Sequence, residues 1–182
     1  RARSVRAAAR LALHRSGREV DPTPLAVMLE SDDAELRGNA ALVLGELGNP
    51  TAIPMLRSAL RDPLEMTSVT RQRIVELQIA EAMVKLGRTS ELEVIHAALF
   101  SPAEQAELVA LACQVMGRLG DSTYAAAMEN KAMTTGRQEQ PAEVRLAAAT
   151  ALAHLDPSRA PISVPLAFVG HDRYELRAYA AA

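Results

Sequence analysis

Residues 35–50, ELRGNAALVLGELGNP, combine an apolar helical stripe with a helix stop. Leu36, Ala40, Leu44 and Leu47 lie at positions i, i+4, i+8 and i+11, which is the spacing of one face of an α-helix rather than of a β-strand. The Gly-Asn-Pro sequence that follows is a typical signal for the end of a helix. The stretch therefore predicts an amphipathic helix whose apolar face must be covered by another part of the chain.

This stretch recurs along the chain. Five full copies and one truncated copy begin at successive spacings of 31, 39, 33, 36 and 32 residues. Their first residues are Val5, Leu36, Val75, Leu108, Val144 and Leu176. A shorter apolar pattern follows, as in Ile53, Leu56 and Leu60 at i, i+3 and i+7. Each repeat is thus predicted to be a helix pair that cannot bury its own apolar faces, so successive pairs must stack into a solenoid.

The copies predict a single array over residues 1–182. Its predicted repeats are about 3–31, 32–63, 70–102, 103–135, 141–171 and a partial repeat at 172–182. Two polar insertions, at residues 62–70 and 134–141, are predicted to be surface loops. The last copy stops in mid-pattern and neither end resembles a polar capping repeat. We therefore expect the chain to be a fragment of a longer array.

The composition favours a helical protein with a core of small side chains. Of the 182 residues, 49% are hydrophobic, only 3% are aromatic and none is tryptophan, which excludes a disordered or collagen-like chain. The single cysteine, Cys113, excludes an internal disulfide framework and a cysteine-based metal site. No run of 18 apolar residues occurs, so no membrane-spanning segment is predicted. The sequence does not indicate in which cellular compartment the protein functions.

The first 18 residues contain six arginines and no acidic residue. Such a segment is typical of a transit peptide or of a basic surface helix. Because the chain does not begin with methionine, we favour a third explanation, an internal cut through a longer protein.

Two further signals concern helix starts and helix packing. Thr23 and Ser163 each lie shortly before a proline, so both hydroxyls are predicted to cap second helices. Gly38 and Gly45 each cost about 1 kcal/mol relative to alanine inside a helix. We expect the close approach of a neighbouring helix to explain these glycines, with the backbone of a ligand as the alternative.

Residues 32–62, DDAELRGNAALVLGELGNPTAIPMLRSALRD, closely resemble a HEAT repeat, especially the short bacterial type related to phycobilin lyases. The resemblance extends over nearly the whole chain and implies an all-α, right-handed α-α superhelix of HEAT-like helical hairpins, about five in number. In this family an acidic residue and an arginine often form a ladder between repeats. The arginine position holds Arg6, Arg37, Arg145 and Arg177 in four copies, and Glu76 and Val109 in the other two. The ladder is therefore expected to break in the middle of the array.

The resemblance also implies that the first helices form the convex face and that the second helices line a concave groove used for binding. When the copies are aligned, the outward positions of the second helices change charge from repeat to repeat. The candidate partner-binding residues are Arg57, Arg61, Glu93, His96, Phe100, Glu129 and Asn130. Phe100 is either an exposed anchor or a side chain packed under the following turn. A surface of mixed charge favours a protein as the partner.

No catalytic, cofactor-binding or metal-binding residue is predicted. HEAT-repeat deoxyhypusine hydroxylases bind iron through His-Glu pairs, but no His-Glu dipeptide occurs in this sequence. The four histidines, His14, His96, His154 and His171, belong to separate repeats or to opposite ends of neighbouring helices, too far apart to share an ion. Cys113 aligns with an inward small position and is predicted to be a packed apolar side chain. A nucleophile elbow, a phosphate-binding loop and a His-Glu-x-x-His helix are all missing from the sequence.

The leading functional prediction is a scaffold, not an enzyme, that binds a protein through its concave groove. One alternative is nucleic-acid binding, as in HEAT-like alkylpurine DNA glycosylases, but the net charge of −2 disfavours it. Another is a chromophore-lyase-like activity, which the three Tyr and two Phe scattered along the chain support poorly. The identity of the partner and the oligomeric state stay open.

Overall fold

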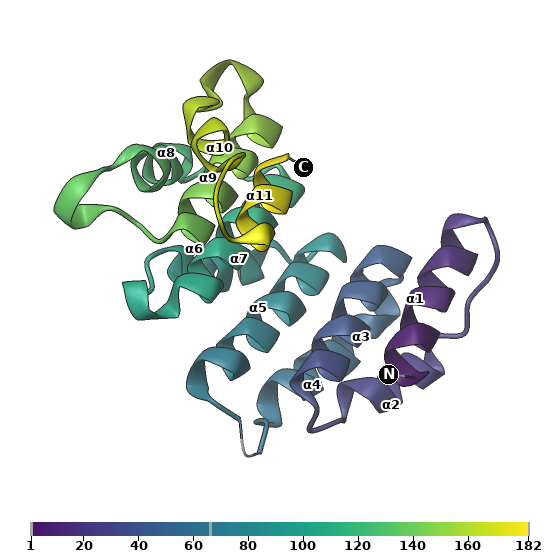
Figure 1. Ribbon diagram of the computed structural model, residues 1–182. Helices are drawn as coiled ribbons and strands as arrows, with labels where there is room; N and C mark the ends of the chain where they lie inside the picture. The colour runs from purple at the N-terminus through teal and green to yellow at the C-terminus, as the bar shows by residue number, and fades with distance from the viewer. Residues whose placement is uncertain (1, 66, 182) are drawn as a thin grey trace. The chain divides into compact units, whose positions relative to one another are not determined.

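The structure is a computed structural model that describes residues 2–65 and 67–181, with side chains from Val5 onward. Every regular element in these residues is a helix (Figure 1). The first helices of the repeats are α1 (Ala2–Arg15), α3 (Ala34–Leu47), α5 (Val69–Lys85), α7 (Ala106–Leu119), α9 (Ala142–Leu155) and α11 (Tyr174–Ala181). The second helices are α2 (Thr23–Leu29), α4 (Ile53–Arg61), α6 (Leu92–Leu99), α8 (Ala125–Met133) and α10 (Ser163–Phe168). This alternation confirms the predicted all-α series of helical hairpins.

Short 3-10 helices occupy many of the connections. They are η1 (Pro50–Ala52), η2 (Thr89–Glu91), η3 (Ala103–Gln105), η4 (Gly136–Gln138) and η5 (Pro157–Arg159). The two predicted loops lie where expected, except that α5 begins at Val69 and that η4 forms within the second loop.

Helix α3 has sequence-encoded boundaries at both ends. The Asp33 carboxylate accepts hydrogen bonds from the backbone N–H groups of Glu35 and Leu36, at 2.9 and 3.2 Å, and so caps the first turn. At the other end Gly48 has a φ of 68°, a left-handed conformation that glycine adopts without steric cost. Gly120 ends α7 in the same way, with a φ of 71°. The predicted glycine stops therefore end these helices.

The predicted hydroxyl caps at Thr23 and Ser163 are wrong. Both residues lie within the first turn, because α2 begins at Thr23 and α10 begins at Ser163. The residues before them, Pro22 and Ile162, make no side-chain capping hydrogen bond. Instead, Asp21 Oδ1 accepts a hydrogen bond from the backbone N–H of Thr23 at 2.9 Å. Once its own backbone is helical, a hydroxyl no longer occupies the capping position.

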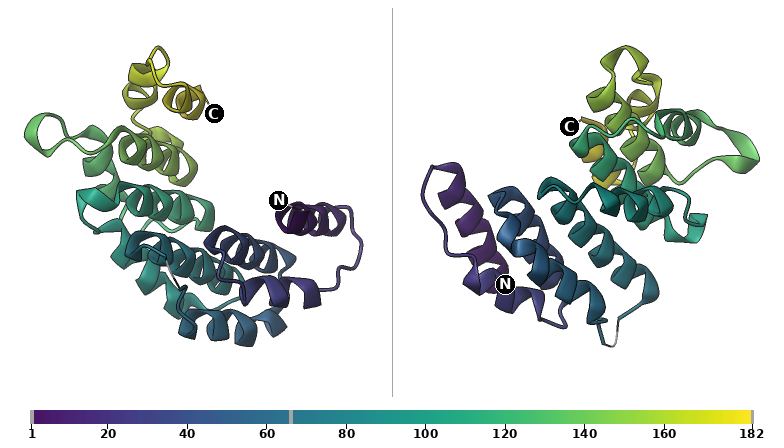
Figure 2. Two further views of the ribbon diagram at one scale, coloured as in Figure 1. Left: turned by 60° about the horizontal axis from the view of Figure 1, so that its bottom comes forward. Right: turned by 180° about the vertical axis from the view of Figure 1, so that it is seen from behind.

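By the density of its internal contacts the chain divides into two compact units, Arg1–Val94 and Ile95–Ala182. In the first unit α1, α3 and α5 lie side by side as one layer, and α2 and α4 pack against this layer as a second one (Figure 1, Figure 2). In the second unit α7, α9 and α11 form the first-helix layer, and α8 and α10 lie against α9. The single array over residues 1–182 and the handedness of the superhelix stay predictions.

The predicted apolar stripe faces the core of the first unit. Leu36, Ala40 and Leu44 are buried, and Leu47 packs partly buried against the same cluster. The partners are the apolar faces of the neighbouring repeats, including Leu56 of α4. The cover that the stripe requires is therefore supplied by adjacent helices, as the repeat pattern predicts.

Glycines let the first helices approach closely. A Cβ atom built on Gly45 of α3 would lie 2.8 Å from the Cα of Ala82 in α5. In the second unit a Cβ on Gly117 of α7 would lie 3.0 Å from the Cα of Ala151 in α9. Gly38 differs, because its added Cβ would meet only the flexible side-chain amide of Gln78. The close approach expected at Gly45 is thus confirmed as helix packing.

Arg37 is a charged side chain inside the first unit, with only 1% of its surface exposed. Its Nε donates to the carbonyl oxygen of Ser31, two residues after the end of α2, at 2.9 Å. Its Nη1 donates to the carbonyl oxygens of Ala59, at 3.3 Å, and Asp62, at the end of α4. The guanidinium therefore satisfies carbonyl groups at the C-terminal ends of two second helices, where a cation is also favoured by the helix dipoles.

The two arginines of the predicted ladder in the second unit, Arg145 and Arg177, also donate hydrogen bonds to carbonyl groups at or after the ends of second helices. Arg145 Nε donates to the carbonyl oxygen of Ala132 in the last turn of α8, at 3.2 Å. Arg177 Nη1 donates to the carbonyl oxygens of His171 and Asp172, which follow α10, at 2.6 and 2.8 Å. These contacts correct the expected acid–arginine ladder in part. Arg37 binds mainly carbonyl groups, with Asp62 as a more distant acidic partner at 3.5 Å, and Arg177 binds two carbonyl groups. Arg145 binds a carbonyl group and also forms a direct ion pair with Glu139.

Candidate partner-binding surface

The predicted binding residues lie on or directly after second helices, as expected. Arg57 and Arg61 belong to α4, Glu93 and His96 to α6, and Glu129 and Asn130 to α8, and Phe100 follows α6. Arg57, Arg61, Glu93 and Asn130 are exposed. Within residues 5–65 and 67–181 none of these four side chains forms an ion pair. A groove that runs along all of these helices stays a prediction, since the residues are divided between the two units.

His96 is held by a carboxylate of the next repeat. Its Nε2 lies 2.5 Å from Asp121 Oδ2, and the two side chains are only 19% and 10% exposed. Asp121 follows Gly120, whose left-handed conformation ends α7. The other carboxylate oxygen of Asp121 accepts from the backbone N–H and the hydroxyl of Thr123, at 3.0 and 2.6 Å. The turn before α8 therefore fixes Asp121, and Asp121 fixes His96.

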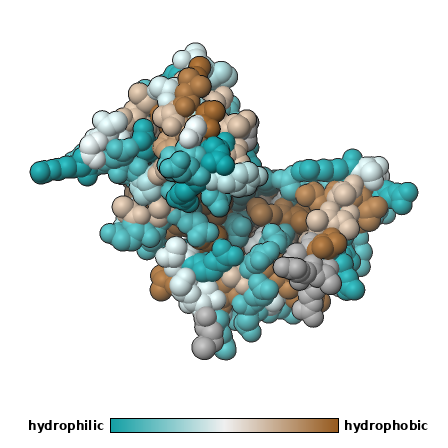
Figure 3. Space-filling model, viewed as in Figure 1, coloured by the Kyte–Doolittle hydropathy of each residue, from teal (hydrophilic) through white to brown (hydrophobic). Residues whose placement is uncertain are grey.

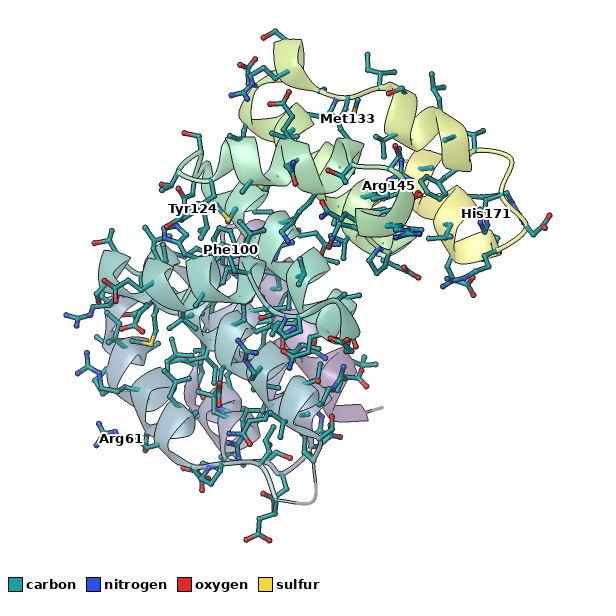
Figure 4. All side chains as sticks on the ribbon, turned by 90° about the vertical axis from the view of Figure 1, so that its left-hand side faces the viewer. Arg61, Phe100, Tyr124, Met133, Arg145 and His171 are labelled. Atoms are coloured by element: carbon teal, nitrogen blue, oxygen red, sulfur yellow. The ribbon has the colours of Figure 1, made fainter. Side chains whose placement is uncertain are left out.

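Two aromatic rings complete this cluster. The ring of Tyr124 lies 4.9 Å from the ring of His96 and 5.2 Å from the ring of Phe100, edge to face in both pairs. Figure 4 shows Phe100 and Tyr124 next to each other. Phe100 nevertheless remains 57% exposed. We call His96, Phe100, Asp121 and Tyr124 the aromatic cluster. The Phe100 ring thus packs against Tyr124, at the start of the next helix, and more than half of the residue faces outward; its role as a binding anchor stays a prediction.

The cluster differs from the predicted alignment of outward residues. His96 and Phe100 meet the start of α8, whereas Glu129 lies five residues beyond Tyr124, roughly 7.5 Å further along the helix axis. Glu129 pairs instead with Arg159, at 2.5 Å. Sequence reasoning missed Asp121 and Tyr124. The available signal was Tyr124 itself, a large aromatic residue at the position that buried Ala52 occupies in the second repeat.

The Asp121 carboxylate is stabilised in its charged form. Burial acts to raise its pKa, but the hydrogen bonds from Thr123 and His96 outweigh burial, so the pKa of Asp121 lies below its usual value. The stabilisation that depends on this shift is fully present above the unfolded pKa, about 4, and is lost as the pH falls through the folded pKa.

Asp121→Asn is expected to lower the free energy of unfolding by about 1 kcal/mol at neutral pH. Asparagine keeps the oxygen that Thr123 uses but replaces the oxygen that faces His96. The variant should therefore lose less stability than the wild type between pH about 5 and about 3. Urea denaturation at several pH values measures both effects. His96→Gln should cost little more in the Asp121→Asn background, and fully additive costs would contradict the pairing.

Other exposed apolar side chains lie on the final second helix, α10, or directly beside it. Ile162, Leu166 and Val169, at i, i+4 and i+7, are 65%, 65% and 51% exposed. Figure 3 shows apolar surface over α10 and over α1. Like Phe100, these side chains offer apolar surface on or beside a second helix.

His154, His171 and Cys113 lie outside the aromatic cluster. No group of three or more His, Cys, Asp and Glu side chains in the described part of the chain is arranged to hold a metal ion. His154 Nδ1 lies 2.8 Å from the carbonyl oxygen of Thr150, and His171 Nδ1 accepts from the backbone N–H of Arg173. Cys113 is fully buried, and burial raises the pKa of its thiol to about 12. Its predicted role as a packed small side chain is confirmed.

None of the helices in residues 2–65 and 67–181 is both long and apolar enough to cross a membrane.

Residues 22–76, which extend from α2 into α5, match the model of the family described as HEAT repeats. This segment is similar to HEAT repeats. Arg37, Gly45 and the apolar stripe of α3 all lie within it.

One solved structure similar to this chain is that of the complex of CpcE and CpcF of phycocyanin lyase from Nostoc sp. PCC7120, with 25% sequence identity and a TM-score of 0.48. The match covers 90% of this chain and 64% of that chain, so this chain spans under two thirds of its length. A comparison with curated proteins gives no match.

Proposed function

We propose that the protein is a scaffold that binds another protein through the exposed surface of its second helices, with Phe100 as the main anchor in the second unit. The observation that supports this proposal is the aromatic cluster. Phe100 offers 57% of its surface to solvent, yet its ring already packs against Tyr124. Exposed aromatic side chains that are held in place before binding lose little conformational entropy, and such residues dominate the energetics of protein interfaces.

The charges on these helices suit a protein surface better than a nucleic acid. Arg57 and Arg61 are exposed on α4, but Glu93 is exposed on α6 and Glu129 is paired with Arg159. Phosphate binding requires several cations that converge on one face. A partner with charges of both signs matches this surface.

Phe100→Ala is expected to weaken the binding of a protein partner by about 30-fold, as for a central aromatic anchor. The full chain is immobilised, partners are captured, and the affinity of each purified partner is measured for the wild type and the variant. Val69→Ala, which truncates a 72% exposed apolar side chain at the start of the first helix α5, outside the proposed surface, should leave the affinity unchanged. Both variants alter exposed groups, so their melting temperatures should stay close to that of the wild type.

Two outcomes would contradict the proposal. One is a partner that both variants bind as tightly as the wild type does. The other is binding of a different class of ligand that does not depend on Phe100. Duplex DNA would show salt-dependent binding, and a bilin would show an absorbance shift on mixing, and in either case Phe100→Ala would behave as the wild type does.

A further inference from the structure

The first unit contains an open pocket of about 330 Å³ between the second helices α2 and α4. Its wall is apolar and includes Ala26 and Leu29 of α2 and Pro54 and Met55 of α4. Ser58, Ala59 and two carboxylates, Glu30 and Asp62, complete the lining. Pockets of this size, with an apolar wall and a few polar groups, are typical of sites that take a small group or a single side chain.

The polar end of the pocket is negative. Glu30 directly follows α2 and Asp62 directly follows α4, so each carboxylate stands at the C-terminal end of a helix. Helix C-termini carry partial negative charge, which adds to the two formal charges. Neither Arg57 nor Arg61 of α4 belongs to the lining. The pocket therefore favours a cation.

The chain itself shows which cation these helix ends accept. The guanidinium of Arg37 binds the carbonyl oxygens of Ser31, Ala59 and Asp62 from inside the core. The Asp62 carboxylate contributes little to this contact, since its Oδ2 lies 3.5 Å from Arg37 and its side chain is 65% exposed. Both Glu30 and Asp62 thus retain acceptor capacity on the side of the pocket.

We propose that this pocket binds an arginine side chain of a protein partner. The apolar wall contacts the methylene stem, and Glu30 and Asp62 accept hydrogen bonds from the planar guanidinium, whose five N–H donors can reach carboxylates on two helices at once. The identity of the partner as a protein rests on the proposed function. The chemistry of the pocket does not, and a short peptide tests it directly.

The test uses the full chain labelled with ¹³C at its methionine methyl groups, because Met55 lines the pocket. The probe is the peptide acetyl-Gly-Arg-Gly-amide, and its control is the same peptide with citrulline, which is neutral and nearly identical in shape. We expect a saturable shift of the Met55 methyl signal with the arginine peptide and about tenfold weaker binding of the citrulline peptide. Signals of the buried methionines Met83 and Met128 should not move.

A pair of variants locates the charge that matters. Glu30→Gln should lower the affinity for the arginine peptide several-fold. Glu35→Gln, which changes an exposed glutamate outside the lining, should leave that affinity unchanged. Equal binding of the arginine and citrulline peptides, an unmoved Met55 signal, or equal affinity of Glu30→Gln and the wild type would each overturn the proposal.

The same titration separates this inference from the proposed function. Phe100→Ala should bind the arginine peptide as the wild type does, because Phe100 does not line the pocket. If a protein partner depends on Phe100 but the peptide does not bind, only the pocket proposal fails. If the peptide binds but no protein partner depends on Phe100, only the scaffold proposal fails.

Discussion

Arg37→Met is expected to lower the free energy of unfolding by about 3 to 4 kcal/mol, the largest effect among single substitutions considered for this protein. Methionine fills a similar volume but donates no hydrogen bond. The carbonyl groups of Ser31, Ala59 and Asp62 would then lose their donor at the ends of α2 and α4. Each unsatisfied buried carbonyl group costs about 1 to 3 kcal/mol, partly offset by water that reaches the exposed side of Asp62.

Urea denaturation followed by far-UV circular dichroism measures this loss. Arg57→Met is the matched control, because Arg57 is exposed on α4, and it should change stability by less than about 0.5 kcal/mol. The loss of stability in Arg145→Met should fall between these two values. Arg145 is 14% exposed, binds one carbonyl group and pairs with Glu139, which is 43% exposed and can be solvated when the arginine is removed. Equal stability of the Arg37 and Arg57 variants would show that Arg37 does not support the helix ends.

The second large effect concerns the contact between α3 and α5. Gly45→Ala is expected to destabilise the protein by about 2 kcal/mol, although alanine is the better helix former by about 1 kcal/mol. The new methyl group would lie 2.8 Å from the Cα of Ala82, which is backbone and cannot move without separating the two helices. Thermal unfolding should show a decrease in melting temperature of several degrees, about 2 to 4 °C per kcal/mol.

Gly38→Ala on the same helix is the control for this prediction. The three atoms nearest to its methyl group would all belong to the end of the Gln78 side chain, which can rotate away. The gain in helix propensity should then dominate, and the variant should be as stable as the wild type or up to about 1 kcal/mol more stable. A Gly45→Ala variant that gains stability like Gly38→Ala would contradict the proposed close approach.

Much of the architecture could be predicted because its determinants are local. The apolar spacing of Leu36, Ala40 and Leu44 requires only the geometry of one helix, and these residues are buried as predicted. The helix ends at Gly48 and Gly120 depend on a conformation that glycine adopts easily. The predicted start of α2 was wrong by one residue. Thr23 lies between two prolines, Pro22 and Pro24, and proline is common at helix starts, so the sequence does not decide which residue begins the helix.

The sites were less predictable because they depend on how neighbouring repeats are offset. The sequence alignment placed His96 beside Glu129, since both occupy the same position in their repeats. In the structure His96 meets Asp121 and Tyr124 at the start of α8. An alignment of copies assumes that every repeat packs against the next one with the same offset. If one helix is displaced by one turn relative to its neighbour, each of its side chains faces different residues of that neighbour.

The sequence by itself determined the alternation of long and short helices, their main boundaries and the faces that must be buried, because these follow from periodicity and from residues close together in the chain. Tertiary structure decided the rest: the capping of two helix ends by Arg37, the aromatic cluster around Tyr124 and the pocket between α2 and α4. Each of these joins residues of different helices, and such contacts depend on helix offsets that no local pattern encodes.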